Sequence, residues 1–365
     1  MSNVRFQDLR VSDPAELAEL LAAVETVLRH GELMLGPELA RFESAVAAHV
    51  GRRFAIGVGS GTAALDVALR ALELQPGDEV ITTPLSFIAT TNAVRLNGAT
   101  PVFADVGDDL NIDPAGIEKQ ITPRTRAILP VHLNGKVCRM EAILEVADRH
   151  GLPVIEDASQ AFGAKRHGKF SGTFSKIGCF SLNPMKGYSA LGEAGVILTD
   201  DAAIDRRLRE LRYNGFVDKI ECRWISPNSH LDTIQAAALL VRLPRLAKVI
   251  GRRVAIAARY RQALGDLVTV PVEDPGCLDV YYHFIVETDR RDELGAFLAE
   301  RGVETRVRPA GGIIPDHFAY RDCRRGEYAV AAAHMKRMLA IPAHDKLTDE
   351  EVGRVIEAIC TFFRA

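Results

Sequence analysis

Apolar residues divide the first part of the chain into helical and strand-like segments. Residues 14–29 and 37–50 carry apolar positions at helical spacing, and each segment opens with a proline and is followed by a glycine. Proline fits the first turn of a helix, and glycine commonly ends one. Residues 54–58 then form a short apolar run that predicts a buried strand, and residues 62–72 predict the next helix.

From residue 79 onward, short apolar runs alternate with helical segments. This alternation is typical of a mostly parallel sheet whose two faces are covered by helices. We therefore predict an α/β fold. The seven predicted strands cover 54–58, 79–82, 101–104, 127–131, 153–156, 177–181 and 194–199, and the predicted helices between and after them include 86–96, a segment begun by Asp113, 140–150 and 200–213.

The pattern changes beyond residue 213. A polar loop over 214–230 leads into an apolar helix over 231–243, which Pro244 breaks. We predict a domain boundary there, with an N-terminal arm and large domain over 1–245 and a smaller α+β domain over 246–365. The elements predicted for the smaller domain are a helix to about 264, a strand over 280–287, a helix over 292–301 and a closing helix that a capping box opens at Thr348.

Composition excludes several classes of protein. The 365 residues are 47 % hydrophobic and 25 % charged, with a formal net charge of −3, which is ordinary for a globular enzyme. Acidic and basic residues are mixed along the chain, so a nucleic-acid partner is not predicted. The densest basic patch, at residues 321–325, is interrupted by Asp322 and is typical of a solvated turn.

Cysteine usage and hydropathy indicate a cytoplasmic protein. None of the six cysteines forms a C-x-x-C pair, so neither a metal site nor a redox motif is predicted. Single scattered cysteines fit a reducing compartment. The N-terminus lacks the profile of a signal peptide, and no apolar run approaches the roughly 18 residues of a membrane helix.

Lys186 and Asp157 carry the chemistry that we predict. Each follows the end of a predicted strand. A lysine amine can form a Schiff base with the aldehyde of pyridoxal phosphate, and a carboxylate can keep the pyridine nitrogen of that cofactor protonated. Glu156 could be the acid instead, because alternation along the strand places it on the opposite face from Asp157. Gln160 could donate a hydrogen bond to the phenolate oxygen of the ring.

A glycine-rich turn over 57–62 joins a predicted strand to a predicted helix. Helix N-termini offer free N–H groups to a phosphate, and Ser181 could hold a phosphate oxygen beside them. The turn lacks the P-loop and dinucleotide patterns, so a bound monophosphate is the better functional interpretation. The alternative is a purely structural role, in which the glycines only let the strand join the helix. Phe87 could stack on a flat cofactor or belong to the core. His132 could contact a ligand or satisfy local backbone.

The motifs together resemble the DegT/DnrJ/EryC1/StrS family of pyridoxal-phosphate-dependent sugar aminotransferases, which has fold type I of aspartate aminotransferase. The resemblance covers nearly the whole chain. Its main motifs are GSGTAAL (59–65), TPLSFIATTNAV (83–94), GATPVFADV (98–106), NIDP (111–114), PVHLNG (130–135), VIEDASQAFGA (154–164), FSLNPMKGYSALGEAGVILTD (180–200) and LDTIQAAAL (231–239).

The resemblance implies a role for each matching residue. Lys186 is the Schiff-base lysine and the acid/base that moves the proton. Asp157 pairs with the pyridine nitrogen, Gln160 bonds the ring hydroxyl oxygen, and Phe87 lies over the ring. The residues implied to hold the phosphate are Gly61, Thr62, Ser181 and, from the neighbouring subunit of a homodimer, Asn228.

Two segments depart from the family pattern. His230 stands where many relatives have arginine, and the segment 308–317 is unusually rich in glycine; His317 matches a family histidine there. Both departures concern substrate identity. A subgroup with histidine in place of the lysine acts as a deoxygenating dehydratase, and Lys186 argues against that reaction.

The implied reaction moves an amino group from L-glutamate to a nucleotide-linked keto-sugar, in amino-sugar biosynthesis. Two alternatives stay open. One is another pyridoxal-phosphate enzyme of the same fold, such as a dehydratase or an aminotransferase for a keto-sugar without a nucleotide. The other is a regulatory protein that keeps the fold without turnover.

Overall fold

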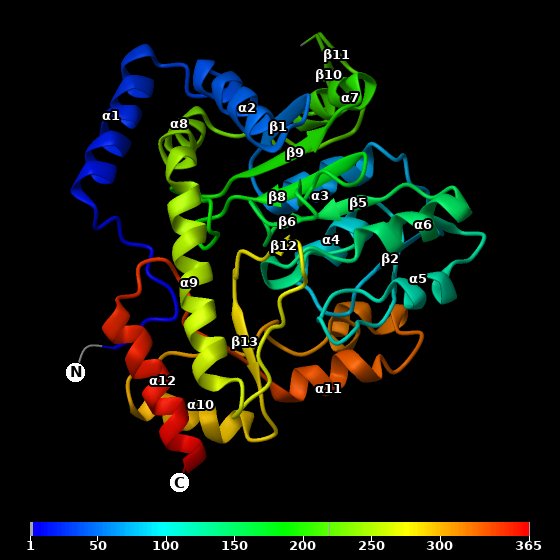
Figure 1. Cartoon of the computed structure of the whole chain (residues 1–365). Helices are drawn as coiled ribbons and strands as arrows, with labels where there is room; N and C mark the ends of the chain where they lie inside the picture. Colours follow the sequence, from blue (N-terminus) through cyan, green and yellow to red (C-terminus); the bar gives the residue numbers. More distant parts are fainter. Residues whose placement is uncertain (1–2, 219, 365) are drawn as a thin grey trace.

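A seven-stranded sheet forms the centre of the larger part of the molecule in the computed structural model, which describes residues 3–218 and 220–364 (Figure 1). The strand order is β1-β9-β8-β5-β4-β2-β3, with β5 and β4 joined through parallel bridges. Strand β9 runs antiparallel to both neighbours, and every other pair is parallel. The strands are β1 (Phe54–Val58), β2 (Glu79–Thr82), β3 (Thr100–Phe103), β4 (Thr125–Ile128), β5 (Ile155–Asp157), β8 (Ile177–Ser181) and β9 (Gly195–Thr199).

Helices cover both faces of this sheet, as the apolar strands predict. Side chains alternate across a strand, so Ala55 of β1 joins the core on one face while Ile56 joins the core on the other. Against the Ile56 face pack α3 (Gly61–Arg70), α4 (Ala89–Leu96) and α7 (Ala202–Arg212). Against the Ala55 face pack α2 (Pro37–Val50), α5 (Pro114–Gln120), α6 (Met140–His150) and α8 (Thr233–Arg242), with α1 (Pro14–His30) lying on α8.

The C-terminal part forms a smaller layer around an antiparallel strand pair. After the 3₁₀ turn η2 (Leu243–Arg245) at Pro244, it contains α9 (Leu246–Leu264), β13 (Phe284–Glu287), α10 (Arg291–Glu300), α11 (Ala329–Arg337), β14 (Met338–Ile341) and α12 (Asp349–Arg364). Val4 bridges to Val303 and lies in the same core cluster as α9 and α12. The N-terminal arm therefore packs against the C-terminal part, and the boundary at residue 245 stays a prediction.

Short strands and single turns complete the chain. These are η1 (Leu133–Gly135), β6 (Lys165–Arg166), β7 (Lys169–Phe170), β10 (Phe216–Val217), β11 (Glu221–Cys222), β12 (Cys277–Leu278), η3 (Ile314–Asp316) and η4 (Phe318–Cys323). No helix in the described ranges is long and apolar enough to span a membrane.

Local chemistry explains where several elements begin. The Thr348 side chain accepts from the Glu351 N–H and the Glu351 carboxylate accepts from the Thr348 N–H, at 3.1 and 2.9 Å, so the predicted capping box forms. The predicted helix from residue 86 begins later, at Ala89, after a loop in which the Leu85 N–H donates to the Thr83 hydroxyl at 3.1 Å. The predicted strand 280–287 is shorter, because Tyr281 has φ 46° and interrupts the extended backbone.

Candidate active site

The segments that follow β1, β2, β5 and β8 line one cavity of about 540 Å³. These four strands point the same way, and ligands of such sheets bind beyond the carboxyl ends of the strands. Asn228, one of the predicted phosphate ligands, does not line this cavity in its own chain. The other seven predicted site residues do: Gly61, Thr62, Phe87, Asp157, Gln160, Ser181 and Lys186.

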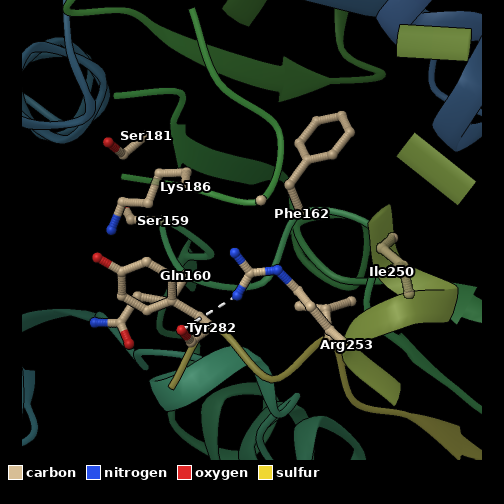
Figure 2. Close-up of a pocket in the computed structure, with 10 residues that line it drawn as sticks. Ser159, Gln160, Phe162, Ser181, Lys186, Ile250, Arg253 and Tyr282 are labelled. Atoms are coloured by element: carbon tan, nitrogen blue, oxygen red, sulfur yellow. Dashed lines mark hydrogen bonds between the residues drawn. The ribbon is translucent and has the colours of Figure 1, made fainter. Parts of the chain in front are cut away.

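Lys186 lies in a turn after β8, where its N–H donates to the C=O of Asn183 at 2.9 Å. Its Nζ is 4.1 Å from the ring centroid of Tyr282, and Figure 2 shows the two side chains next to each other. Within the described chain, no carboxylate forms an ion pair with this amine. The lysine amine therefore lies against an aromatic face. No acidic side chain of the described residues neutralises its charge.

Asp157 is a buried carboxylate, 3 % exposed, at the end of β5. The Thr90 hydroxyl donates to its Oδ2 at 2.8 Å, and the Ser159 N–H donates to its Oδ1 at 3.1 Å. Among the described residues, no cation pairs with Asp157. Burial of a carboxylate without a cation is unfavourable, so this side of the cavity suits a ligand that brings a positive charge, such as a protonated ring nitrogen.

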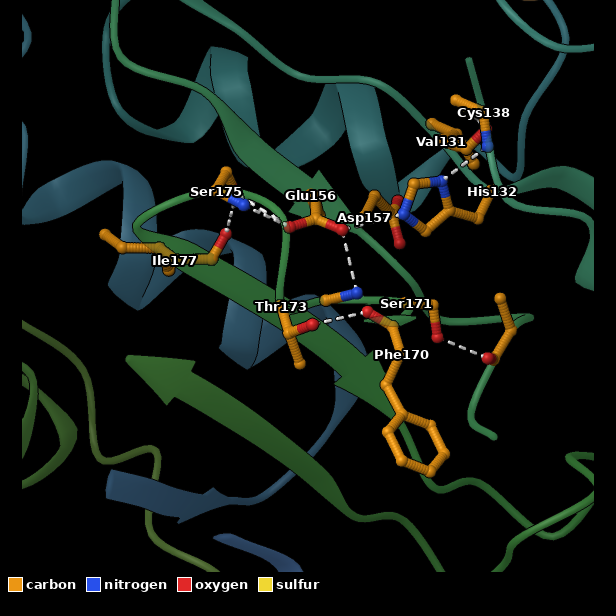
Figure 3. Close-up of polar contacts among 12 residues, drawn as sticks. Val131, His132, Cys138, Glu156, Asp157, Phe170, Ser171, Thr173, Ser175 and Ile177 are labelled. Carbon is orange, nitrogen blue, oxygen red and sulfur yellow. Dashed lines mark hydrogen bonds and ion pairs between the residues drawn. The ribbon is translucent and has the colours of Figure 1, made fainter. Parts of the chain in front are cut away.

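Glu156 points to the opposite face of β5, into a polar network away from the cavity (Figure 3). Its carboxylate accepts from His132 Nε2 at 3.0 Å, from the Gly172 N–H at 2.8 Å, and from the N–H and hydroxyl of Ser175 at 2.7 and 2.9 Å. Burial acts to raise the pKa of Glu156, but hydrogen bonds from His132 and Ser175 outweigh it and hold the pKa below its ordinary value. Of the two candidate acids, Asp157 alone faces the cavity.

His132 belongs to the same network and does not reach the cavity. Its Nδ1 accepts from the Cys138 N–H at 3.2 Å, so its Nε2 carries the proton that is donated to Glu156. The imidazole is fully buried. Of the two interpretations of His132, the structure therefore favours local hydrogen bonding over contact with a ligand.

The N-terminus of α3 forms the end of the cavity that suits a phosphate. Ser60 caps the helix by accepting from the Ala63 N–H at 3.0 Å. The N–H groups of Gly61 and Thr62 have no partner in the described chain. A Cβ added at Gly61 would lie 2.5 Å from the Cβ of Ser181. Glycine is therefore required for β8 to pass this close to the helix, and two free donors lie beside the Ser181 hydroxyl.

The amide of Gln160 has one fixed orientation. The Asn134 N–H donates to its Oε1 at 2.8 Å, and because a backbone N–H can only donate, the amide oxygen must lie at that position. The NH₂ group of Gln160 is then the end left for a ligand. Phe87, 66 % exposed, lies at the same cavity with its ring free to cover a flat group.

Other residues lining the cavity were given no role from the sequence. Asn134 comes from the loop after β4, Tyr282 and His283 come from the C-terminal part, and Arg308 opens the segment that departs from the family pattern. Burial, followed by the positive charges of Lys186, Arg308 and Arg253, holds the pKa of His283 well below its ordinary value. No local sequence pattern distinguishes these residues from core residues, because they meet the strand ends only in the folded chain.

The residues at the two family departures are also placed, together with Asn228. His317 lines the cavity, so the segment 308–317 forms part of its wall. His230 does not line it and contacts Asn228 through Nδ1 and the amide oxygen. Asn228 is exposed.

Comparison with known proteins identifies the family. Residues 14–360 match the model of the DegT/DnrJ/EryC1/StrS aminotransferase family. The chain belongs to this family. As a DegT/DnrJ/EryC1/StrS protein it is 40 % identical over 360 residues to a dTDP-3-amino-3,4,6-trideoxy-alpha-D-glucose transaminase from Streptomyces venezuelae, covering 98 % of this chain and 95 % of that protein. It is 37 % identical over 368 residues to a pleiotropic regulatory protein from Geobacillus stearothermophilus, covering 99 % of each.

A solved DegT/DnrJ/EryC1/StrS structure has the same fold. The crystal structure of S. venezuelae DesV in complex with a ketimine intermediate superposes with a TM-score of 0.96 at 39 % identity, covering 100 % of each chain. The predicted α/β fold of type I is thereby confirmed. Family membership and the ketimine complex imply pyridoxal phosphate as the cofactor of this family.

Proposed function

We propose that this aminotransferase holds pyridoxal phosphate at Lys186 and moves an amino group from L-glutamate to a nucleotide-linked keto-sugar in amino-sugar biosynthesis. One observation carries the proposal. A single cavity brings together a lysine amine, a buried carboxylate and the N–H groups of a helix N-terminus, and residues 3–218 and 220–364 provide no counter-ion or hydrogen-bond acceptor that would occupy the amine or the N–H groups and no cation for the carboxylate. These are the three partners that an aldehyde, a protonated pyridine and a phosphate require.

The residues present fit each part of the cofactor. Asp157 would pair with the ring nitrogen and supply the negative charge that keeps it protonated. Gln160 would donate its NH₂ group to the ring hydroxyl oxygen, and Phe87 would cover the ring. Gly61, Thr62 and Ser181 would hold the phosphate, together with Asn228 of a second copy of this chain.

When bound, pyridoxal phosphate supplies an aldehyde that captures amines and a ring that takes up electrons. The protein positions the groups around it. Lys186 Nζ would hold the cofactor through its aldehyde; once the donor amine has displaced it, the freed amine would be the base that removes a proton from the amine-bearing carbon of the donor and the acid that returns one. Asp157 would keep the ring nitrogen protonated, which is the charge that lets the ring take up electrons.

The substrate class follows from the relatives. The Streptomyces venezuelae transaminase is named for a dTDP-linked amino sugar and matches nearly the whole chain. The Geobacillus relative carries a regulatory name, but a purely regulatory role gives no reason to keep Lys186 and Asp157 in one cavity. Exposed Asn228 supports a homodimer with shared sites, and six unpaired cysteines support a cytoplasmic location.

Label transfer tests this function directly. The purified protein, loaded with pyridoxal phosphate, is incubated with ¹⁵N-labelled L-glutamate and a panel of keto-sugar nucleotides. We expect the label in one amino-sugar nucleotide and a borohydride-reduced cofactor adduct on Lys186 in a peptide digest. An adduct on another side chain, or none at all, would contradict the assignment and favour a regulatory role.

A further inference from the structure

A chain of hydroxyl groups leads from the cavity wall to Asp157. The Oγ atoms of Ser86 and Thr90 are 2.7 Å apart, and the Thr90 hydroxyl is 2.8 Å from Oδ2 of Asp157. Ser86 and Thr90 both line the cavity, and both side chains are buried. Neither residue belongs to the cofactor contacts described above.

The proton positions along this chain follow from simple valence. A carboxylate can only accept, so the single hydroxyl proton of Thr90 points to Asp157. The Thr90 oxygen must then accept from Ser86. The Ser159 N–H occupies the other carboxylate oxygen. Each oxygen of Asp157 therefore has one fixed donor, and together these donors define the plane of the carboxylate.

Thr90 also connects the two ends of the cavity. It lies in the first turn of α4, which packs against α3. The N-terminus of α3 carries the free N–H groups of Gly61 and Thr62. Thr90 therefore contacts Asp157 from a helix that packs directly against the helix of the proposed phosphate site.

We infer that Thr90, itself oriented by Ser86, is a positioning residue that aims the Asp157 carboxylate at the cofactor ring nitrogen. This inference rests on the proposed function. Without the Thr90 hydroxyl, Oδ2 of Asp157 loses its donor and the carboxylate can rotate about its χ2 angle. The interaction with the ring nitrogen then weakens, while the contacts to the aldehyde and the phosphate are unchanged.

Binding of two cofactors separates this role from a general loss of structure. The probes are pyridoxal 5′-phosphate and its 1-deaza analogue, which has a carbon in place of the ring nitrogen. Wild type is expected to bind pyridoxal phosphate more tightly than the analogue. Thr90→Val should reduce this preference by roughly 10- to 150-fold, the range for one hydrogen bond to a charged group. Affinity for the analogue should barely change.

Thr91→Val is the matched control. Thr91 is the next residue of α4, is fully buried, and donates to the C=O of Ile88 at 3.0 Å. Its substitution removes one hydroxyl and one hydrogen bond, but none to Asp157, so the cofactor preference should stay at the wild-type value. Thr90→Ser keeps the hydroxyl and should restore most of the preference.

The outcomes distinguish a failure of this inference from a failure of the proposed function on which it rests. A Thr90→Val protein with wild-type preference overturns the positioning role and leaves the proposed function intact. Wild type that forms no adduct at Lys186 overturns both. If Thr90→Val does not fold, as judged by circular dichroism, Ser86→Ala takes its place. Loss of the donor to Thr90 should reduce the preference by a smaller factor, and an unchanged preference would again overturn the role.

Discussion

Lys186 is the one lysine among the described residues that line the cavity. Its amine faces the ring of Tyr282 and has no acidic partner among the described residues, so it can react with an aldehyde. Asp157, in the same cavity, has hydrogen-bond donors but no cation from the described part of the chain. The proposed cofactor would bring the two groups that these side chains can meet, a carbonyl for the amine and a positive charge for the carboxylate.

Lys186→Ala should abolish amino transfer while the protein stays folded. The substitution removes both the anchor and the acid/base, and groups that move protons contribute roughly 10²–10⁴-fold each. Lys176→Ala is the control, because Lys176 lies on an exposed turn just before β8. Transfer of ¹⁵N from glutamate gives the readout, and wild-type transfer by the Lys186→Ala protein would contradict the mechanism.

Glu156→Gln and Asp157→Asn should have different effects, although the two acids are adjacent. Glu156 accepts four hydrogen bonds in a buried network. The amide that replaces the carboxylate in Glu156→Gln would point its NH₂ group at groups that are themselves donors. We expect a loss of stability of about 2–4 kcal/mol. Asp157→Asn should keep the stability and weaken the binding of pyridoxal phosphate. Thermal denaturation and cofactor titration of both proteins distinguish these outcomes.

The start of α3 shows how one helix places backbone N–H groups at the cavity. Its N-cap places two free N–H groups at the cavity, and β8 passes within van der Waals contact at Gly61. The approach is possible because glycine has no Cβ. The helix start thus provides backbone donors for the proposed phosphate site, with the Ser181 hydroxyl as their neighbour.

Gly61→Ala should lower the affinity for pyridoxal phosphate at least tenfold, because the new Cβ would lie 2.5 Å from Ser181 and push the helix away from β8. Gly353→Ala is the matched control: Gly353 lies within α12, and a Cβ there meets nothing within 4 Å. This control should keep cofactor affinity and gain up to about 1 kcal/mol of stability. Equal cofactor affinities in the two variants would contradict the proposed phosphate site.

At the scale of the whole molecule, the cavity wall is built from both parts of the chain. The segment 308–317 lines the cavity, and the residues after it are tied to the large sheet. Arg325 bonds the buried Glu79 at 2.7 Å, Arg95 pairs with Asp322, and Ile314 donates to Pro84 at 2.9 Å. These contacts hold the C-terminal part over the strand ends.

The contact at Glu79 predicts a pH dependence. Burial acts to raise the pKa of Glu79, but hydrogen bonds from Arg325, Thr122 and Arg124 outweigh it and lower the pKa from 4.5 to about 2. The folded protein binds this proton less strongly than the unfolded chain does. The stabilisation is therefore complete above pH 4.5 and is lost as the pH falls toward 2.

Comparison of wild type with Glu79→Gln by chemical denaturation checks this prediction. The difference in unfolding free energy should be constant from pH 7 to pH 5 and shrink below pH 4.5, where the unfolded chain takes up the proton. A difference that grows on acidification would show that the ion pairs at Glu79 do not stabilise the folded state.

The proposed homodimer makes a prediction about mixed subunits. If Asn228 completes the site of a second copy, Lys186→Ala and Asn228→Ala proteins should each be impaired, and activity should return when they are unfolded and refolded together. One site of each mixed dimer then contains an intact lysine and an intact asparagine. Activity equal to the sum of the two separate proteins would indicate that each chain holds its own complete site.

The sequence by itself determined the family and most of the elements of the large sheet. Strands β1 to β5, β8 and β9 were predictable because each is a short apolar run buried on both faces, and α1 and α2 because proline opens them and glycine ends them. Strand β14 was missed, since its residues Met338–Ile341 follow a helix without a turn signal. The motifs around Lys186, Asp157 and Gly61 indicated the cofactor, and the match to the family model confirmed the resemblance.

Only the tertiary structure decided which groups meet. Strand alternation alone left both Glu156 and Asp157 open as the functional acid, and the structure shows that the pleat of β5 sends Glu156 to a buried network and Asp157 to the cavity. The sequence left two roles open for His132, contact with a ligand and local hydrogen bonding. Its buried contact with Glu156 favours the second. Thr90 lies 67 positions from Asp157, so only the fold of the sheet brings its hydroxyl to that carboxylate. Local patterns specify elements because neighbouring residues interact within them, whereas a site joins residues that are distant along the chain.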